Sequence, residues 1–303
     1  LAAGFHFIPN PYPSAIDYES ATLSGVGATI WVWDPKRPSA GGYVTTNRVS
    51  GESAPLGGTY SAYNPVIPHG TAFWVLSTGS GTVTFSEASK VNSSFNLMGR
   101  TFNSNARIRV NLYNAAATEL LDGVVSAHNP NASEGEDDGD ALKFSIGAEN
   151  VSLWRFNKNW AIEYRPLVTQ ADTIFIRLHN MAQRSYQLEL SGESFTLPAG
   201  AAAVLRDLFL GTETPITVNG VQRIPFAVTA DAASSGNRFQ VVFRFNTITP
   251  VRDVTAERGF AIYPNPVQPG TNLQLEFRNR AAGKYTIVVY NMLGMQVQQS
   301  VVT

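Results

Sequence analysis

The sequence predicts an all-β protein, and three observations support this prediction. Nearly every apolar segment alternates with a period of two between Gly, Pro, Asn or Ser residues, the pattern of half-buried strands. Helical spacing appears only near residues 115–121 and 201–210, and both segments are too short to form a layer. Charged residues make up 15% of the chain, below the roughly 25% of average soluble domains.

The alternating segments follow one another at short intervals, with turn residues between them. This arrangement is typical of β-sandwich or jelly-roll-like domains. The clearest predicted strands before residue 250 are 28–33, 71–76, 82–85, 106–113, 173–178, 185–190 and 238–245.

We predict four regions along the 303 residues. Residues 1–90 form a first β region, which either stands alone or shares a sandwich with the β-sandwich domain expected at 91–249. Residues 250–257 are polar and turn-prone, as expected of a linker, and residues 258–303 begin a fresh alternation. Because the chain starts at Leu1 and lacks the pattern of a signal peptide there, we expect a fragment of a longer protein.

Composition excludes several classes of function. The 22 Lys and Arg residues balance 23 Asp and Glu residues, so no basic field exists to attract nucleic acid. The absence of Cys excludes disulfides, thiolate zinc sites and a Cys nucleophile. No apolar run approaches the ~18 residues of a membrane-spanning helix, so we expect no transmembrane segment.

The most informative stretch is the last one. Strand-like runs at 260–263, 272–278, 284–290 and 295–302 surround Tyr263-Pro264-Asn265-Pro266 and a predicted tight turn at 291–294. Each Pro fixes its own φ and favours an extended residue before it, which suits an edge strand. Gly294 can supply a positive φ in the turn.

This stretch resembles the type A C-terminal sorting domain of proteins exported by the type IX secretion system of Gram-negative bacteria. The resemblance covers about residues 258–303 and rests on order and spacing together. The matching residues are Tyr263, Pro264, Asn265, Pro266, Leu273, Leu275, Gly283, Tyr285, Ile287, Val289, Tyr290, Asn291, Gly294 and Val297.

The resemblance implies a small Ig-like β-sandwich that is recognised by the type IX translocon and an outer-membrane shuttle protein. It also implies an extracellular, outer-membrane-associated location, with the exported protein attached to anionic lipopolysaccharide or otherwise kept on the cell surface. Family members end in a further strand pair, whereas this sequence ends at Val301-Val302-Thr303, so we expect an incomplete domain.

Four upstream segments resemble pieces of the proteins that carry such domains. These are residues 7–18, 67–75, 137–144 and 237–243. They resemble structural parts of β-sandwich stalks, which implies an adhesin-like surface protein. A competing interpretation is an accessory or glycan-binding region of a secreted polysaccharide-degrading enzyme.

An acidic run at 134–140 gives the first candidate binding site. Glu134, Glu136, Asp138 and Asp140 stand at alternate positions, with Gly139 where a calcium loop turns sharply. Ser145 stands where such a loop needs its bidentate Glu. A solvated acidic loop is therefore the simpler interpretation, and Ca²⁺ binding is the alternative; no cofactor is required.

Tryptophans give the second candidate. Aromatic platforms beside amides suit sugar stacking, and "WRFNKNW" places Trp154, Asn157, Asn159 and Trp160 in one segment that looks polar and exposed. Surface glycans are the partner this site would imply. Core packing explains the same tryptophans, as well as the alternation of Trp31 and Trp33 on one strand face.

No catalytic motif is present. The four His residues have no metal-ligand spacing, and the sequence holds no Gly-x-Ser-x-Gly, His-Glu-x-x-His or phosphate loop. We therefore expect no enzyme here. The adhesive ligand, the residues upstream of Leu1, the native C-terminus and its cleavage, and the oligomeric state are left open by the sequence.

Overall fold

The computed structural model describes residues 1–37, 41–57, 60, 62–92, 105–144, 147–197, 200–245, 260–268, 270–277, 281–291 and 293–303. They belong to two compact units, Leu1–Asn246 and Thr247–Thr303. Among these described residues the only helical pieces are three single 3₁₀ turns, η1 (Tyr18–Ser20), η2 (Glu87–Ser89) and η3 (Ala232–Ser234). The all-β class predicted from sequence is confirmed.

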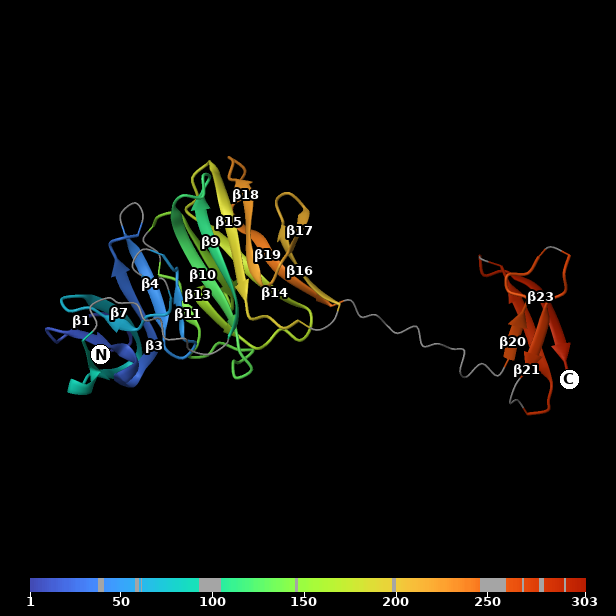
Figure 1. The fold of residues 1–303 in the computed structure, drawn as a ribbon, viewed down its shortest axis with the longest axis horizontal. Helices are drawn as coiled ribbons and strands as arrows, with labels where there is room; N and C mark the ends of the chain where they lie inside the picture. The colour runs from blue at the N-terminus through green and yellow to red at the C-terminus, as the bar shows by residue number, and fades with distance from the viewer. Residues whose placement is uncertain are drawn as a thin grey trace. The chain divides into compact units, whose positions relative to one another are not determined.

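The first unit begins with a small sandwich (Figure 1, blue to cyan). A five-stranded sheet has the order β1 (Gly4–Pro9), β7 (Ala72–Thr84), β3 (Thr22–Asp34), β4 (Gly42–Asn47) and β5 (Glu52–Ala54). A three-stranded sheet has the order β6 (Val66–Ile67), β2 (Ala15–Asp17) and β8 (Lys90–Val91). Ile16 and Ile67 of the second sheet pack with Ile30, Phe73 and Val75 of the first in one buried cluster.

The rest of the first unit is an eleven-stranded sheet. Its path is β17 (Thr212–Ile216), β16 (Ala201–Asp207), β19 (Gly236–Phe245), β14 (Asp172–His179), β12 (Asn150–Arg155), β13 (Lys158–Arg165), β10 (Leu120–His128), β9 (Ala106–Asn114), β15 (Ser185–Glu193) and β18 (Gly220–Ala227). The short β11 (Ala141–Leu142) pairs with β13 beside this path.

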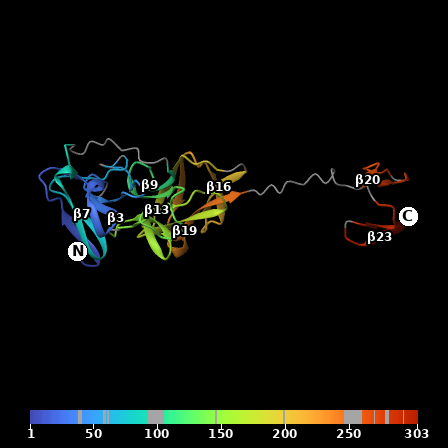
Figure 2. The same ribbon diagram turned by 90° about the horizontal axis from the view of Figure 1, so that it is seen from below.

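This long sheet curls back on itself around a single core. Six strands lie between β18 and β19 along the sheet, yet the Phe226 and Phe239 rings they carry are 5.1 Å apart. Figure 2 shows β9, β13, β16 and β19 gathered in the same body. One apolar cluster draws residues from strands throughout the path, so the curled sheet forms a sandwich of the jelly-roll-like kind predicted.

Buried polar contacts join the small sandwich to the curled sheet. The Glu52 side chain of β5 is fully buried, and its carboxylate lies 2.6 Å from the Arg109 guanidinium and 3.3 Å from that of Arg107, both on β9. The Trp31 indole of β3 donates to the carbonyl of Leu142 in β11 at 2.9 Å. The two sheets on either side of residue 90 therefore belong to one compact unit.

The second unit holds two antiparallel strand pairs. β20 (Phe260–Tyr263) pairs with β21 (Gln274–Phe277), and β22 (Tyr285–Tyr290) pairs with β23 (Gln296–Val302). All four strands fall within the runs predicted from sequence. No described side chain in this unit is buried, so the sheets leave apolar surface open.

No helix in the described part of the chain is long and apolar enough to cross a membrane.

Candidate functional site: the tail module and the surface of the first unit

The Tyr-Pro-Asn-Pro motif lies on the surface of the second unit. β20 ends at Tyr263, whose side chain is 44% exposed. Pro264, Asn265 and Pro266 then form an exposed bend rather than a continuation of the strand. The predicted edge strand therefore stops one residue before the first Pro, because neither Pro can donate to a ladder.

The other motif residues shape the second strand pair. The Asn291 side-chain oxygen accepts hydrogen bonds from the backbone N–H groups of Leu293 and Met295, each at 3.0 Å, and Gly294 has a φ of +74°. This is the predicted turn between β22 and β23. Tyr285 donates to the Ala281 carbonyl at 2.6 Å, while Gly283 and Tyr290 are exposed beside it.

An open apolar groove lies between the two strand pairs. It has a volume of about 870 Å³, and the Phe277 and Tyr285 rings stack across it with centroids 5.2 Å apart. Figure 2 draws the β20 and β23 regions as separate layers. The remaining apolar lining comes from Ile262, Leu273, Leu275, Ile287, Val288, Val289 and Tyr290. A surface of this kind can take up an apolar strand or loop from another chain.

The acidic run of the first unit distributes its carboxylates among separate partners. The Glu136 carboxylate lies 2.6 Å from the Lys158 amine, and the Glu134 carboxylate lies 3.9 Å from the Arg155 guanidinium. Asp140 accepts hydrogen bonds from the backbone N–H groups of Tyr164 and Asp137, and its burial raises its pKa to about 6. Asp138 is exposed.

Within the described residues, no three His, Asp or Glu side chains lie where they could hold one metal ion. Calcium binding by residues 134, 136, 138 and 140 stays a prediction. Thermal unfolding with and without the ion tests it. Because Lys158, Arg155 and backbone amides already engage three of these carboxylates, we expect the same melting temperature in EDTA and in Ca²⁺. A rise of several degrees with Ca²⁺ would contradict that expectation and would show that the loop binds the ion.

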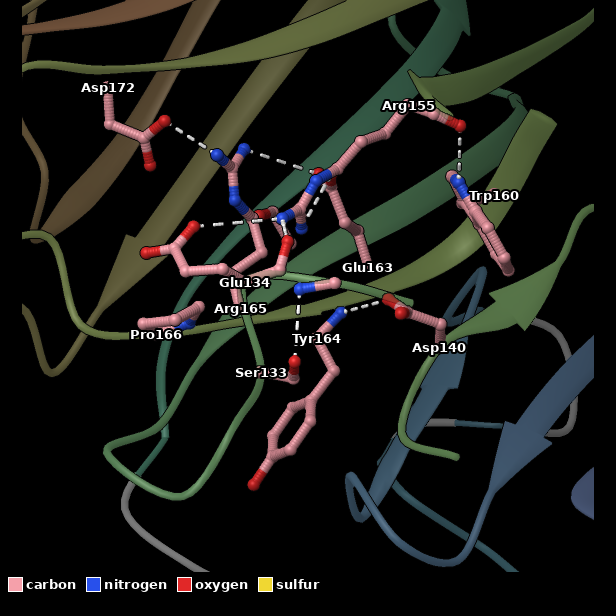
Figure 3. Close-up of polar contacts among 12 residues, drawn as sticks. Ser133, Glu134, Asp140, Arg155, Trp160, Glu163, Tyr164, Arg165, Pro166 and Asp172 are labelled. Atoms are coloured by element: carbon pink, nitrogen blue, oxygen red, sulfur yellow. Dashed lines mark hydrogen bonds and ion pairs between the residues drawn. The ribbon is translucent and has the colours of Figure 1, made fainter. Parts of the chain in front are cut away.

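Next to this loop, two arginines enclose a buried glutamate (Figure 3). The Glu163 carboxylate lies 3.5 Å from the Arg155 guanidinium and 3.5 Å from that of Arg165, and Arg165 also pairs with Asp172 at 2.6 Å. Burial raises the pKa of Glu163, which the two arginines only partly offset.

A pocket of about 430 Å³ lies beside this network and includes Arg155, Arg165 and Arg244 in its lining. Each of these arginines has a carboxylate partner, since Arg244 pairs with Glu213. The pocket therefore carries no unneutralised arginine that would attract an anion, and the network acts as structural support for β12 to β14.

The fold buries one of the predicted glycan residues and leaves the others at the surface of the β12–β13 hairpin. Trp160 is 2% exposed within the main core, and its indole donates to the Arg155 carbonyl at 3.0 Å (Figure 3). Asn157 lies in the tight turn between β12 and β13 with a φ of +58°. Trp154 is partly exposed under the Arg177 guanidinium, 4.4 Å from the ring centroid, and Asn159 accepts a hydrogen bond from Ser152. Of the two tryptophans, only Trp154 offers a ring to solvent.

A second aromatic surface lies on the five-stranded sheet, on the face opposite the small core. We call it the aromatic stripe: Phe5, Phe7, Trp31, Trp33, Tyr43, Trp74 and Phe144. Phe7 packs on Trp74 with centroids 4.9 Å apart, Phe144 packs on Tyr43 at 4.8 Å, and Trp33 packs on Tyr43 at 5.1 Å. Phe7 is 55% exposed and Trp33 is 36% exposed.

Sequence reasoning noted Trp31 and Trp33 on one face but missed the rest of the stripe. The pairing of β1 with β7 and of β7 with β3 brings Phe7 and Trp74 beside Trp31 and Trp33. Phe144 follows β11 of the curled sheet and reaches the stripe by packing on Tyr43 and Trp74. The alternation of Phe5 and Phe7 was the one local signal available.

Comparison with known families bears on the second unit. Residues 261–303 match the family model of the secretion system C-terminal sorting domain. The match includes the Tyr-Pro-Asn-Pro bend, the Asn291 turn and both strand pairs. No curated protein and no solved structure shows significant similarity to the chain. Residues 261–303 are therefore a type IX secretion C-terminal sorting domain, and their presence implies a protein that interacts with the type IX machinery and is exported to the cell surface or beyond.

Proposed function

We propose that residues 1–246 are the non-catalytic, adhesin-like cargo of this sorting domain, displayed on the outer surface of the cell as a stalk or adhesive module. Support comes from the architecture: a large sandwich held by aromatic packing and by buried ion pairs such as Glu52 with Arg109 and Asp207 with Arg238. Attachment to anionic lipopolysaccharide after export, and an outer-membrane location, belong to the same proposal. The alternative, an accessory region of a secreted polysaccharide-degrading enzyme, is distinguished by the domain found upstream of Leu1.

The observation that supports recognition by the export machinery is the open apolar groove of the sorting domain. Its half-buried Ile287 and Leu275 side chains face no closed core, so we propose that the export machinery covers this groove when it recognises the exposed bend at 263–266. Apolar contacts and free strand edges would supply the affinity, and the shape of the Pro-Asn-Pro bend would supply the specificity of recognition.

A charge inside the groove is the direct test. Because a buried unpaired carboxylate is costly, Ile287→Asp is expected to lower export of the full chain by about tenfold or more. Val301→Asp is the matched control, since Val301 is 47% exposed, does not line the groove and is not one of the motif residues. Secretion is measured as the fraction of the protein outside the cell. Equal export of Ile287→Asp and wild type would contradict the proposal that the export machinery covers this groove.

The aromatic stripe favours a second candidate function, glycan binding. Four neighbouring strands, β1, β7, β3 and β4, present partly exposed rings, and sugar rings stack on such faces. On a glycan array, we expect Phe7→Ala and Trp33→Ala to weaken any bound sugar by about tenfold, while Phe175→Ala, an exposed ring on β14, leaves binding unchanged. A Trp154→Ala arm tests the loop predicted from sequence. Absence of any bound glycan on the wild-type chain would exclude this function.

A further inference from the structure

A lysine and an aspartate lie in direct contact inside the first unit. Lys143 follows β11 directly, Asp122 lies on β10, and their side chains are only 6% and 10% exposed. The Lys143 amine nitrogen is 2.7 Å from both oxygens of the Asp122 carboxylate. The nitrogen is thus within about 3 Å of the carboxyl carbon, the separation of a near-attack geometry.

Both side chains are held in place by further hydrogen bonds. Asp122 Oδ2 also accepts the backbone N–H of Val151 at 3.0 Å, and the Lys143 amine also contacts the Gly123 carbonyl at 3.2 Å. The Lys143 backbone N–H donates to the Asn159 carbonyl at 2.9 Å. Each reacting group is therefore fixed by the strands next to it, which removes most of the orientational cost of bringing two groups together.

The surroundings reduce the cost of forming the uncharged amine, the form that can act as a nucleophile. Burial lowers the pKa of Lys143 although Asp122 acts in the opposite direction, and the Arg37 cation nearby lowers it further. A desolvated lysine is a recognised way of activating this side chain. Transfer of a proton from the Lys143 ammonium to the Asp122 carboxylate replaces two buried charges with a neutral pair, which a dry interior tolerates better.

We propose that Lys143 and Asp122 condense to an intramolecular amide bond. The Lys143 nitrogen attacks the Asp122 carboxyl carbon, so a carbon–nitrogen bond forms and one carbon–oxygen bond breaks. Two of the three ammonium protons leave with that oxygen as water, and the third stays on the amide nitrogen. Charges cancel on both sides of this reaction, and no oxidant or other reagent takes part.

The position of this cross-link gives it a structural purpose. The neighbouring Leu142 carbonyl accepts from the Trp31 indole, and the Leu121 carbonyl accepts from Arg37. The bond would therefore tie together two of the points at which the small sandwich contacts the curled sheet. It would constrain the unfolded chain as a disulfide does, in a protein that has no Cys.

Intact-mass spectrometry of the purified full chain tests the proposal. We expect a mass lower than that of the sequence by one water molecule, no tryptic cleavage after Lys143, and a branched peptide joining Lys143 to the segment that contains Asp122. A wild-type mass equal to that of the sequence would overturn the proposal.

Lys143→Arg is the decisive control variant. It keeps a cation beside Asp122, so the ion pair and the fold are retained, but a guanidinium does not form the amide. We expect the Lys143→Arg mass to equal that of its own sequence. Since Asp122-Gly123 can also lose water by closing on its own backbone, a water loss that persists in Lys143→Arg would overturn the cross-link as well.

Discussion

Replacing Glu52 with alanine is expected to lower the free energy of unfolding of the first unit by about 3–5 kcal/mol. The Glu52 side chain is fully buried between Arg107 and Arg109, whose side chains are 19% and 12% exposed. Alanine would remove the carboxylate that pairs with Arg109, while Arg107 would keep its ion pair with Glu193 at 3.1 Å. Burial lowers the pKa of Arg109 even with Glu52 present, so this guanidinium has little solvent to replace its partner.

Denaturant unfolding followed by Trp fluorescence measures the effect, since all five Trp residues lie in the first unit. Glu52→Gln is the matched control: it keeps an acceptor for Arg109 and is expected to lose less than alanine. The double variant Glu52→Leu with Arg109→Leu removes both members of the closest pair, and we expect it to recover part of the stability. A loss below about 1 kcal/mol for Glu52→Ala, as for a surface pair, would contradict this assignment.

Strand positions were predictable because the alternation of apolar and polar residues is a property of each short segment. The run 106–113 became β9 and the run 238–245 lies in β19. Residues 201–210, which show helical spacing, instead form β16, because Ala203 and Leu205 alternate into the core beside β19. Sheet order could not be predicted, since it depends on pairings between segments distant in sequence.

The candidate sites, like the strands, were predictable where they depend on neighbouring residues and not where they depend on distant ones. The type IX motif was identifiable because its residues are close in sequence and form their own turns. Trp160 was predicted in an exposed loop, yet the turn takes only Phe156 and Asn157, so Trp160 falls on β13 and faces the core. The acidic run has the spacing of a calcium loop, but Lys158, more than twenty residues away from Glu136, competes for its carboxylate. Such long-range partners have no local signal.

Deletion of residues 258–303 is expected to abolish export while leaving the cargo folded. The first unit contains the three buried apolar clusters of the described residues and the Glu52 network, and it forms a compact unit without the tail. Its unfolding free energy should therefore be unchanged by the deletion. The sorting domain holds the matched family motif, so without it the export machinery has nothing on this chain to recognise, and the folded cargo should stay inside the cell.

The measurement that tests this account most directly compares the full chain with the deletion in a strain that has the type IX system. The fraction of each protein on the cell surface and in the medium is determined by immunoblotting, and a reporter fused to the intact sorting domain serves as the reciprocal control. The account predicts that the full chain and the fusion leave the cell and that the deletion stays inside. Export of the deletion at the level of the full chain would contradict it.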